Sequence, residues 1–85
     1  MNPVLIKSIV ELAVFLGLSG DDIVNADAAI VQLEQLAFTL KQLDADERLL
    51  LAKHINGIAI QERKLGHSSA ERVLFLETLP EHLGL

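Results

Sequence analysis

Residues that typically begin an α-helix recur along the chain, and this pattern constrains the fold more than any other feature of the sequence. Asn2 followed by Pro3, Asn25, Asp44 and Ser68 each stand before a segment rich in aliphatic residues. A side-chain oxygen at such a position accepts a hydrogen bond from a free amide of the first turn, and proline fits that turn because it has no amide hydrogen to donate. The pattern therefore predicts four helices.

The expected ends of these helices follow from glycine, proline and short joints. Gly17 and Gly66 are placed to stop the first and third helices, and Pro80 is placed to halt the fourth. Asp44-Ala-Asp-Glu47 forms a capping box directly after the second helix, and Ser68-Ser-Ala-Glu71 forms another before the fourth. The sequence predicts helices over residues 3–16, 26–43, 45–65 and 69–79.

Asn56-Gly57 interrupts the pattern inside the third helix. This pair often closes a β-hairpin, but helix-forming residues precede it and only Ile58 to Ile60 follow as strand-forming residues. We therefore expect one continuous helix. Glycine costs a helix interior about 1 kcal/mol relative to alanine, so we predict that another helix packs closely against Gly57.

Composition supports one small helical domain. The chain has 85 residues, of which 51% are hydrophobic, 22% are charged and none is cysteine. The apolar content is too high for a disordered chain and is almost entirely aliphatic. Without disulfides, a chain of this length is stabilised by core packing or by oligomerisation. We predict a single all-α domain over residues 1–85, an up-and-down four-helix bundle with a leucine-rich core.

Charge and hydropathy argue against two classes of partner. The formal net charge of -5 opposes binding to nucleic-acid phosphates, and no tyrosine or tryptophan is present to stack on bases. After Lys7 and Glu11, the longest uncharged stretch is Leu12–Gly20, well short of the roughly 20 residues that cross a bilayer. Lys7 also lies inside the apolar N-terminal stretch, whereas the charge of a signal peptide precedes it. We expect no nucleic-acid or membrane partner, and the lack of cysteine favours the cytoplasm.

Three histidines are the only candidates for transition-metal binding or proton transfer. His54, His67 and His82 are 13 and 15 residues apart, so no pair has the spacing that places two ligands on one face of a helix. We therefore expect no metal, cofactor or catalytic site. The alternative is a small-molecule pocket or minor enzymatic site between helices, with His54 or His67 as its polar group.

Acidic side chains form two groups beside the second helix. Asp21 and Asp22 precede it, whereas Asp44, Asp46 and Glu47 follow it. Counted from Asp21 or from Asp22, neither register supplies the glycine and the glutamate that an EF-hand calcium loop requires. Because no catalytic constellation is present, we expect a small acidic protein–protein interaction module, an adaptor or an inhibitor of the immunity type. Its predicted partner-binding residues are the members of these two groups.

The first helix has more apolar surface than one face of a bundle covers. Between Val4 and Leu16 only Lys7, Ser8 and Glu11 are not apolar. A second copy that covers the excess stripe would form a closed two-fold dimer. We therefore predict a homodimer. The alternative is a monomer in which this helix is central and surrounded by the other three. The predicted dimer interface comprises Ile6, Val10, Ala13 and Val14.

Overall fold

The structure, a computed structural model, contains four helices and no strand, and it describes every residue from Met1 to Leu85. The predicted all-α fold is confirmed. The helices are α1 (Pro3–Leu18), α2 (Ala26–Leu40), α3 (Ala45–Leu65) and α4 (Ala70–His82).

Most of the predicted helix caps are present. The side-chain oxygens of Asn2, Asn25 and Asp44 accept hydrogen bonds from backbone amides in the first turns of α1, α2 and α3, at 2.8, 3.0 and 2.8 Å. Gly66 ends α3 in the left-handed conformation, with a φ of 70°, which glycine adopts without steric cost. The third helix passes through Asn56-Gly57 without a break, as predicted.

The cap of α4 differs from the prediction by one residue. The N-cap is Ser69, whose hydroxyl oxygen accepts a hydrogen bond from the Arg72 amide at 3.1 Å. Ser68 lies one residue before the cap, and its hydroxyl donates a hydrogen bond to the Glu62 carboxylate. The serine chosen from the sequence therefore tethers α4 to α3.

Two predicted stop signals lie inside helices. The first helix continues through Gly17 and ends at Leu18. The fourth continues through Pro80 to His82, because a proline in the last turn removes only its own amide, and the Leu83 amide still donates to the Leu79 carbonyl at 3.0 Å.

The second helix is shorter than predicted. It ends at Leu40, and the chain then tightens into a turn in which the amides of Gln42 and Leu43 donate to carbonyls three residues earlier. This turn redirects the chain into α3.

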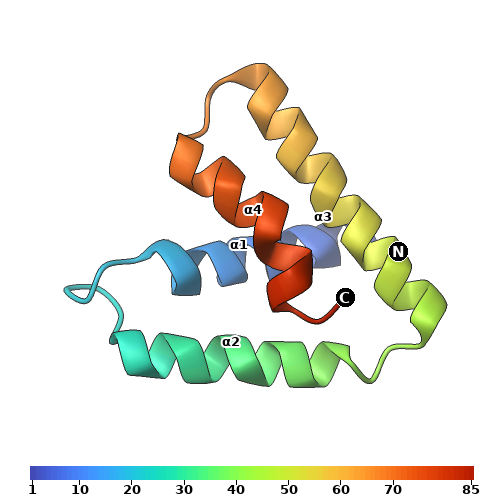
Figure 1. Ribbon diagram of the computed structural model, residues 1–85, viewed down its shortest axis with the longest axis horizontal. Coiled ribbons are helices and arrows are strands. Elements are labelled where there is room, and N and C mark those ends of the chain that lie inside the picture. Colours follow the sequence, from blue (N-terminus) through green and yellow to red (C-terminus); the bar gives the residue numbers. More distant parts are fainter.

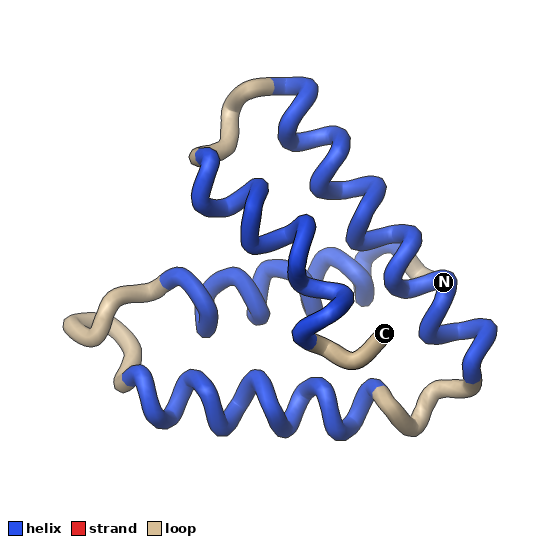
Figure 2. Tube along the Cα trace, viewed as in Figure 1, coloured by secondary structure: helices blue, strands red, loops and turns tan.

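Consecutive helices reverse direction, which is compatible with the predicted up-and-down topology, but the four helices do not all lie side by side. The hairpin of α3 and α4 lies steeply across the hairpin of α1 and α2 (Figure 1), and α2 and α3 diverge from their joint (Figure 2). The most extensive contact is between α3 and α4, and α1 packs against each of the other three helices. The first helix therefore contacts all three other helices but is not surrounded by them, because Val4, Leu5 and Leu12 are more than half exposed.

The core lies where the two hairpins cross. It contains no buried polar or charged side chain. Its buried members come from all four helices and the C-terminal tail, and leucine is the commonest among them: Ile6, Val10, Ala13, Leu40, Leu51, Ile55, Ala59, Leu76, Leu79 and Leu83.

A glycine sets how closely α4 approaches α1. A Cβ atom added to Gly17 would overlap the ring of Phe75, far inside van der Waals contact. Gly17 therefore acts as a contact point for an aromatic ring of α4. Gly57 behaves in the opposite way, because nothing lies within 4 Å of the position its Cβ would take. The prediction that a helix packs closely against Gly57 is wrong.

Candidate functional site

A large groove lined mainly by apolar side chains lies between α2 and α4. Its volume is about 610 Å³, which is within the range of clefts that bind ligands or partner side chains. Four of its lining residues come from α4 and the tail, and the others come from α2 and its C-cap residue, Lys41. The lining residues are Ile30, Leu33, Glu34, Ala37, Phe38, Lys41, Phe75, Leu79, His82 and Leu83.

The floor and the walls of this groove differ in exposure. Leu79 and Leu83 are fully buried core residues, so the floor is part of the hydrophobic core. Ile30 and Phe38 rise from α2 and are 54% and 64% exposed. The groove is therefore an opening onto the core whose wall consists of large apolar side chains left in water.

The groove exists because α2 is attached on one side only. Its main contact is with α1, and it has only weak contact with α3 and α4. Ala29 and Leu40 are its only buried residues, although most of the helix is apolar. A helix that is apolar on several sides requires cover on several sides, and this chain supplies cover on one.

Charged side chains stand at intervals along the groove. Neither Glu34 nor Lys41 forms an ion pair within the chain. The Lys41 side chain lies beside Gly84 in the tail, where an added Cβ would be 2.9 Å from the Lys41 Cε. Gly84 has a φ of 69°, so this turn and the absence of a side chain leave room for Lys41 at the end of the groove.

The residues predicted for the dimer interface are mostly in the core. Ile6, Val10 and Ala13 are 3%, 1% and 0% exposed and pack against the other helices of the same chain, and Val14 is half-buried. The excess apolar surface of α1 exists, but other side chains carry it: Val4, Leu5, Leu12 and Phe15. The face predicted to be exposed is therefore the buried one. The sequence does not reveal which stripe of an apolar helix is covered by α3 and α4.

The predicted partner-binding acidic residues are all exposed. Asp21 and Asp22 lie in the loop before α2, and Asp44, Asp46 and Glu47 lie at the start of α3. The two groups are at opposite ends of α2, whose 15 residues span about 22 Å. They therefore form two separate sites.

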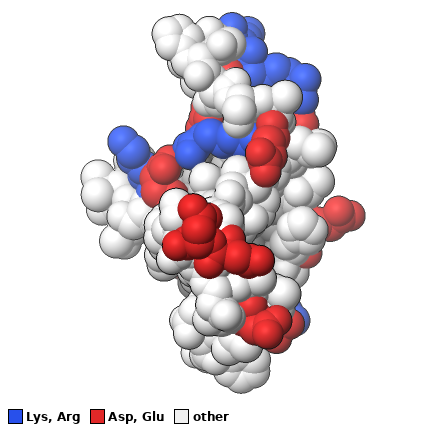
Figure 3. Space-filling model, turned by 90° about the vertical axis from the view of Figure 1, so that its left-hand side faces the viewer, with Lys and Arg blue, Asp and Glu red and all other residues white.

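The acidic group at the start of α3 has a structural explanation. Asp44 is the N-cap of α3, and Asp46 and Glu47 lie in its first turn, where carboxylates interact favourably with the helix dipole. Figure 3 views the end of the molecule that carries the α1–α2 loop. An acidic cluster lies in the middle of that face, and the basic side chains lie in its upper half, beside further acidic ones.

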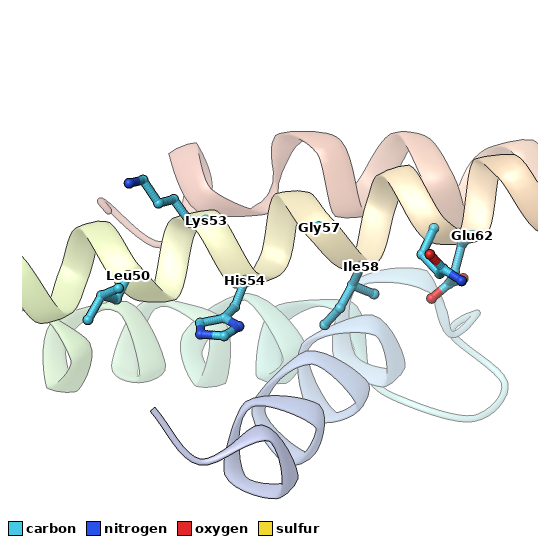
Figure 4. A pocket seen from close by; sticks show the side chains of 7 residues that line it. Leu50, Lys53, His54, Gly57, Ile58 and Glu62 are labelled. Atoms are coloured by element: carbon cyan, nitrogen blue, oxygen red, sulfur yellow. The ribbon is translucent and has the colours of Figure 1, made fainter.

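His54 lies at a cleft, as the alternative interpretation required. It is exposed on α3 and points towards α1 (Figure 4). The cleft between α1 and α3 has a volume of about 310 Å³, and its polar lining consists of Lys7, Glu11, His54 and Glu62. A second, shallower groove follows α3 from Leu50 to Glu62 and also includes His54 (Figure 4).

His67 is in the exposed α3–α4 loop, and its side chain forms no ion pair within the chain. No group of three or more His, Asp or Glu side chains lies close enough together to hold a metal ion. Of the two histidines singled out from the sequence, only His54 is therefore part of a described cleft.

The sequence interpretation missed an ionic network at the other end of the α1–α3 cleft. Arg72 on α4 donates hydrogen bonds to Glu62 on α3 at 2.7 and 3.1 Å and to Glu11 on α1 at 2.6 Å. One guanidinium thereby joins three helices. No spacing rule relates residues this far apart in the sequence, so no signal in one sequence could have identified the network.

The hydrogen bonds of this network shift the pKa values of its members. The hydrogen bond from Arg72 lowers the pKa of the Glu62 carboxyl below its usual value, against the opposing effect of burial, and the Ser68 hydroxyl adds to the lowering. The two carboxylates raise the pKa of Arg72. Glu62 therefore stays ionised, and the network acts as a fixed clamp rather than as a proton donor or acceptor near neutral pH.

The molecule exposes more surface than its mass requires. Its accessible area is 5,696 Å², whereas a compact monomer of 9.3 kDa typically exposes about 5,000 Å². Large apolar side chains contribute to the excess on every helix.

No helix is long and apolar enough to cross a bilayer. No family model, curated protein or solved structure matches the chain.

Proposed function

We propose that this chain is a non-catalytic protein–protein interaction module that associates with a second copy of itself. The observation that carries the proposal is the apolar surface left uncovered in the single chain, above all at the groove between α2 and α4, where Ile30 and Phe38 are more than half exposed beside an opening onto the core.

The excess area is close to the area that a dimer buries. The chain exposes about 700 Å² more than a typical monomer of its mass. A standard interface buries about 800 Å² on each partner. Association with one further copy would bring the exposed area of each chain to the value expected of a compact fold.

The acidic groups support a role for the dimer as an adaptor or inhibitor. Asp21, Asp22, Asp44, Asp46 and Glu47 are exposed, and none forms an ion pair within the chain. Exposed carboxylates at two separate places favour a partner protein with basic patches and oppose binding to nucleic acid. We place the protein in the cytoplasm, since it has no cysteine to form disulfides.

The experiment is a measurement of mass in solution. Sedimentation equilibrium or light scattering across the micromolar range is expected to give twice the chain mass of 9.3 kDa. A mass of one chain throughout this range would overturn the proposal.

A second candidate function is small-molecule binding at the α1–α3 cleft. It is favoured by the position of His54, which points towards α1 beside Lys7 and Glu11. A thermal-shift screen of metabolites tests it. A ligand for this cleft raises the melting temperature of the native chain and of His67→Ala, which alters an exposed loop, but not that of His54→Ala.

A further inference from the structure

The residues of α2 and its C-cap that line the groove form one stripe of the helix. They recur at helical spacing over about three turns, and the stripe comprises Ile30, Leu33, Glu34, Ala37, Phe38 and Lys41. Within it, the carboxylate of Glu34 and the ammonium of Lys41 are two turns apart, about 10 Å along the axis. Phe38, the most exposed apolar side chain of the stripe, is thus bracketed by one negative and one positive charge.

We propose that the occupant of the groove is α2 of a second copy, packed antiparallel, so that Glu34 of each chain pairs with Lys41 of the other. This inference rests on the proposed self-association and assigns it a surface, an orientation and a register. A two-fold axis that crosses α2 between Ala37 and Phe38 makes the two ion pairs equivalent.

The charges select this arrangement over its competitors. Parallel α2 helices related by a two-fold axis would place Glu34 beside Glu34 and Lys41 beside Lys41. An antiparallel register centred on Glu34 would bring Ile30 against Phe38 of the other copy, but it would also set the two Glu34 carboxylates against each other. Like charges at the centre of an interface cost several kcal/mol. Of these three arrangements, only the one centred between Ala37 and Phe38 pairs each charge with its opposite.

The side chains at the centre of this register also fit. An axis between Ala37 and Phe38 sets the Phe38 ring of one chain over the small Ala37 side chain of the other. Each Phe38 would then enter the opening whose floor is Leu79 and Leu83. An aromatic side chain seated in an apolar pocket is typical of an interface centre, and charged side chains usually surround it at the rim. In the single chain the same ring is 64% exposed.

The test reverses each charge separately. In a homodimer of Glu34→Lys, the introduced lysine would face Lys41, and in a homodimer of Lys41→Glu, the introduced glutamate would face Glu34. Each single variant is expected to raise the Kd of the homodimer at least about tenfold, because two favourable pairs become two repulsive ones. An equimolar mixture of the two variants restores both pairs and is expected to form a heterodimer with a Kd near that of the native chain. The double variant Glu34→Lys/Lys41→Glu is expected to recover homodimerisation.

Matched variants control for net charge. Glu71→Lys changes the net charge as Glu34→Lys does, and Lys53→Glu changes it as Lys41→Glu does, yet both lie outside the groove. With one of the two variants uniformly labelled with ¹⁵N, native mass spectrometry separates the homodimers from the heterodimer by mass and gives the fraction of heterodimer. Circular dichroism confirms that each variant is helical. The control variants are expected to dimerise as the native chain does.

The outcomes separate this inference from the proposed function. A native chain that stays monomeric overturns both. A native dimer that tolerates both charge reversals, or whose single variants fail to form a heterodimer when mixed, overturns the assignment of α2 and leaves self-association in place. Weakening by Glu71→Lys as strong as that by Glu34→Lys would also overturn it, because the effect would then follow net charge rather than the groove.

Discussion

The guanidinium of Arg72 and the carboxylate of Glu62 join the last two helices through hydrogen bonds of 2.7 and 3.1 Å. Their side chains are 24% and 18% exposed, so water screens the pair only in part. The same guanidinium reaches Glu11 on α1. The network therefore adds directional contacts between the α3–α4 hairpin and α1 to the apolar packing of the core, since the hydrophobic effect itself has no directional preference.

Glu62→Gln is expected to lower the free energy of unfolding by about 1–2 kcal/mol at pH 7, the usual worth of a charged hydrogen bond. Because the folded-state pKa of Glu62 is below its ordinary value of 4.5, the ionised carboxylate contributes stability above that pH. This contribution is lost as the pH falls through the lowered pKa. The difference between native chain and variant should therefore shrink below pH 4.5.

Urea denaturation at several pH values measures this difference. The control is Glu77→Gln, which removes the more exposed pair with Arg63 and should change stability by about 0.5 kcal/mol or less. A difference between Glu62→Gln and the native chain that stays constant from neutral pH down to well below the ordinary pKa of 4.5 would contradict the assigned role of the ionised carboxylate.

Gly57→Ala is expected to stabilise the protein by about 1 kcal/mol, because alanine is the better helix former. The position is exposed, and an added methyl group would meet no atom within 4 Å. Thermal unfolding followed by circular dichroism checks the prediction. A lower melting temperature would show that something covers this part of α3 in solution.

Gly17→Ala is expected to destabilise the protein by about 1–3 kcal/mol, the usual cost of forcing an extra methyl group into a packed contact. The methyl group would collide with the Phe75 ring. Phe75→Leu should relieve part of this collision, so the double variant is expected to lose less stability than the sum of the two single variants. Chemical denaturation of the three variants measures these losses, and additive losses would mean that the two residues do not touch.

Val10→Asp is expected to impair folding, whereas Phe38→Ser is expected to impair dimerisation alone. Val10 is 1% exposed, and a carboxylate there lacks a partner, so Val10→Asp is expected to cost at least about 3 kcal/mol. Phe38 is a groove wall, so Phe38→Ser should keep the helical content and weaken the proposed dimer. Circular dichroism and sedimentation on the same samples check both outcomes. A folded Val10→Asp chain that is simply monomeric would restore the interface first expected on α1.

Most helix starts were predictable from the sequence, whereas several helix ends and the non-local features were not. Asn2, Asn25 and Asp44 cap helices because the bond each one makes closes within three residues. Ser68 was misassigned because two adjacent serines precede the fourth helix: Ser69 caps it, while Ser68 bonds to Glu62 of the preceding helix. The capping pattern contains no information about that contact with the preceding helix.

The crossing of the two hairpins was beyond sequence reasoning for a related reason. A helix as apolar as α1 has several stripes that are equally suited to burial, and periodicity does not rank them. Contacts with α3 and α4 decide that Ile6 and Val10 are covered and that Leu5 and Leu12 are not. The α2–α4 groove was missed because it arises from this crossing, which leaves α2 with one main neighbour.

The one-sided attachment of α2 has a consequence for the lifetime of the protein. A helix whose only buried side chains are Ala29 and Leu40 is released at a lower free energy than the rest of the fold, so its amide hydrogens should exchange with solvent fastest and proteases should cut there first. Occupation of the groove by a second copy would close this route to degradation. A higher protein concentration would then favour the dimer and slow degradation of each chain. Dilution would favour the monomer, in which α2 is open to proteases.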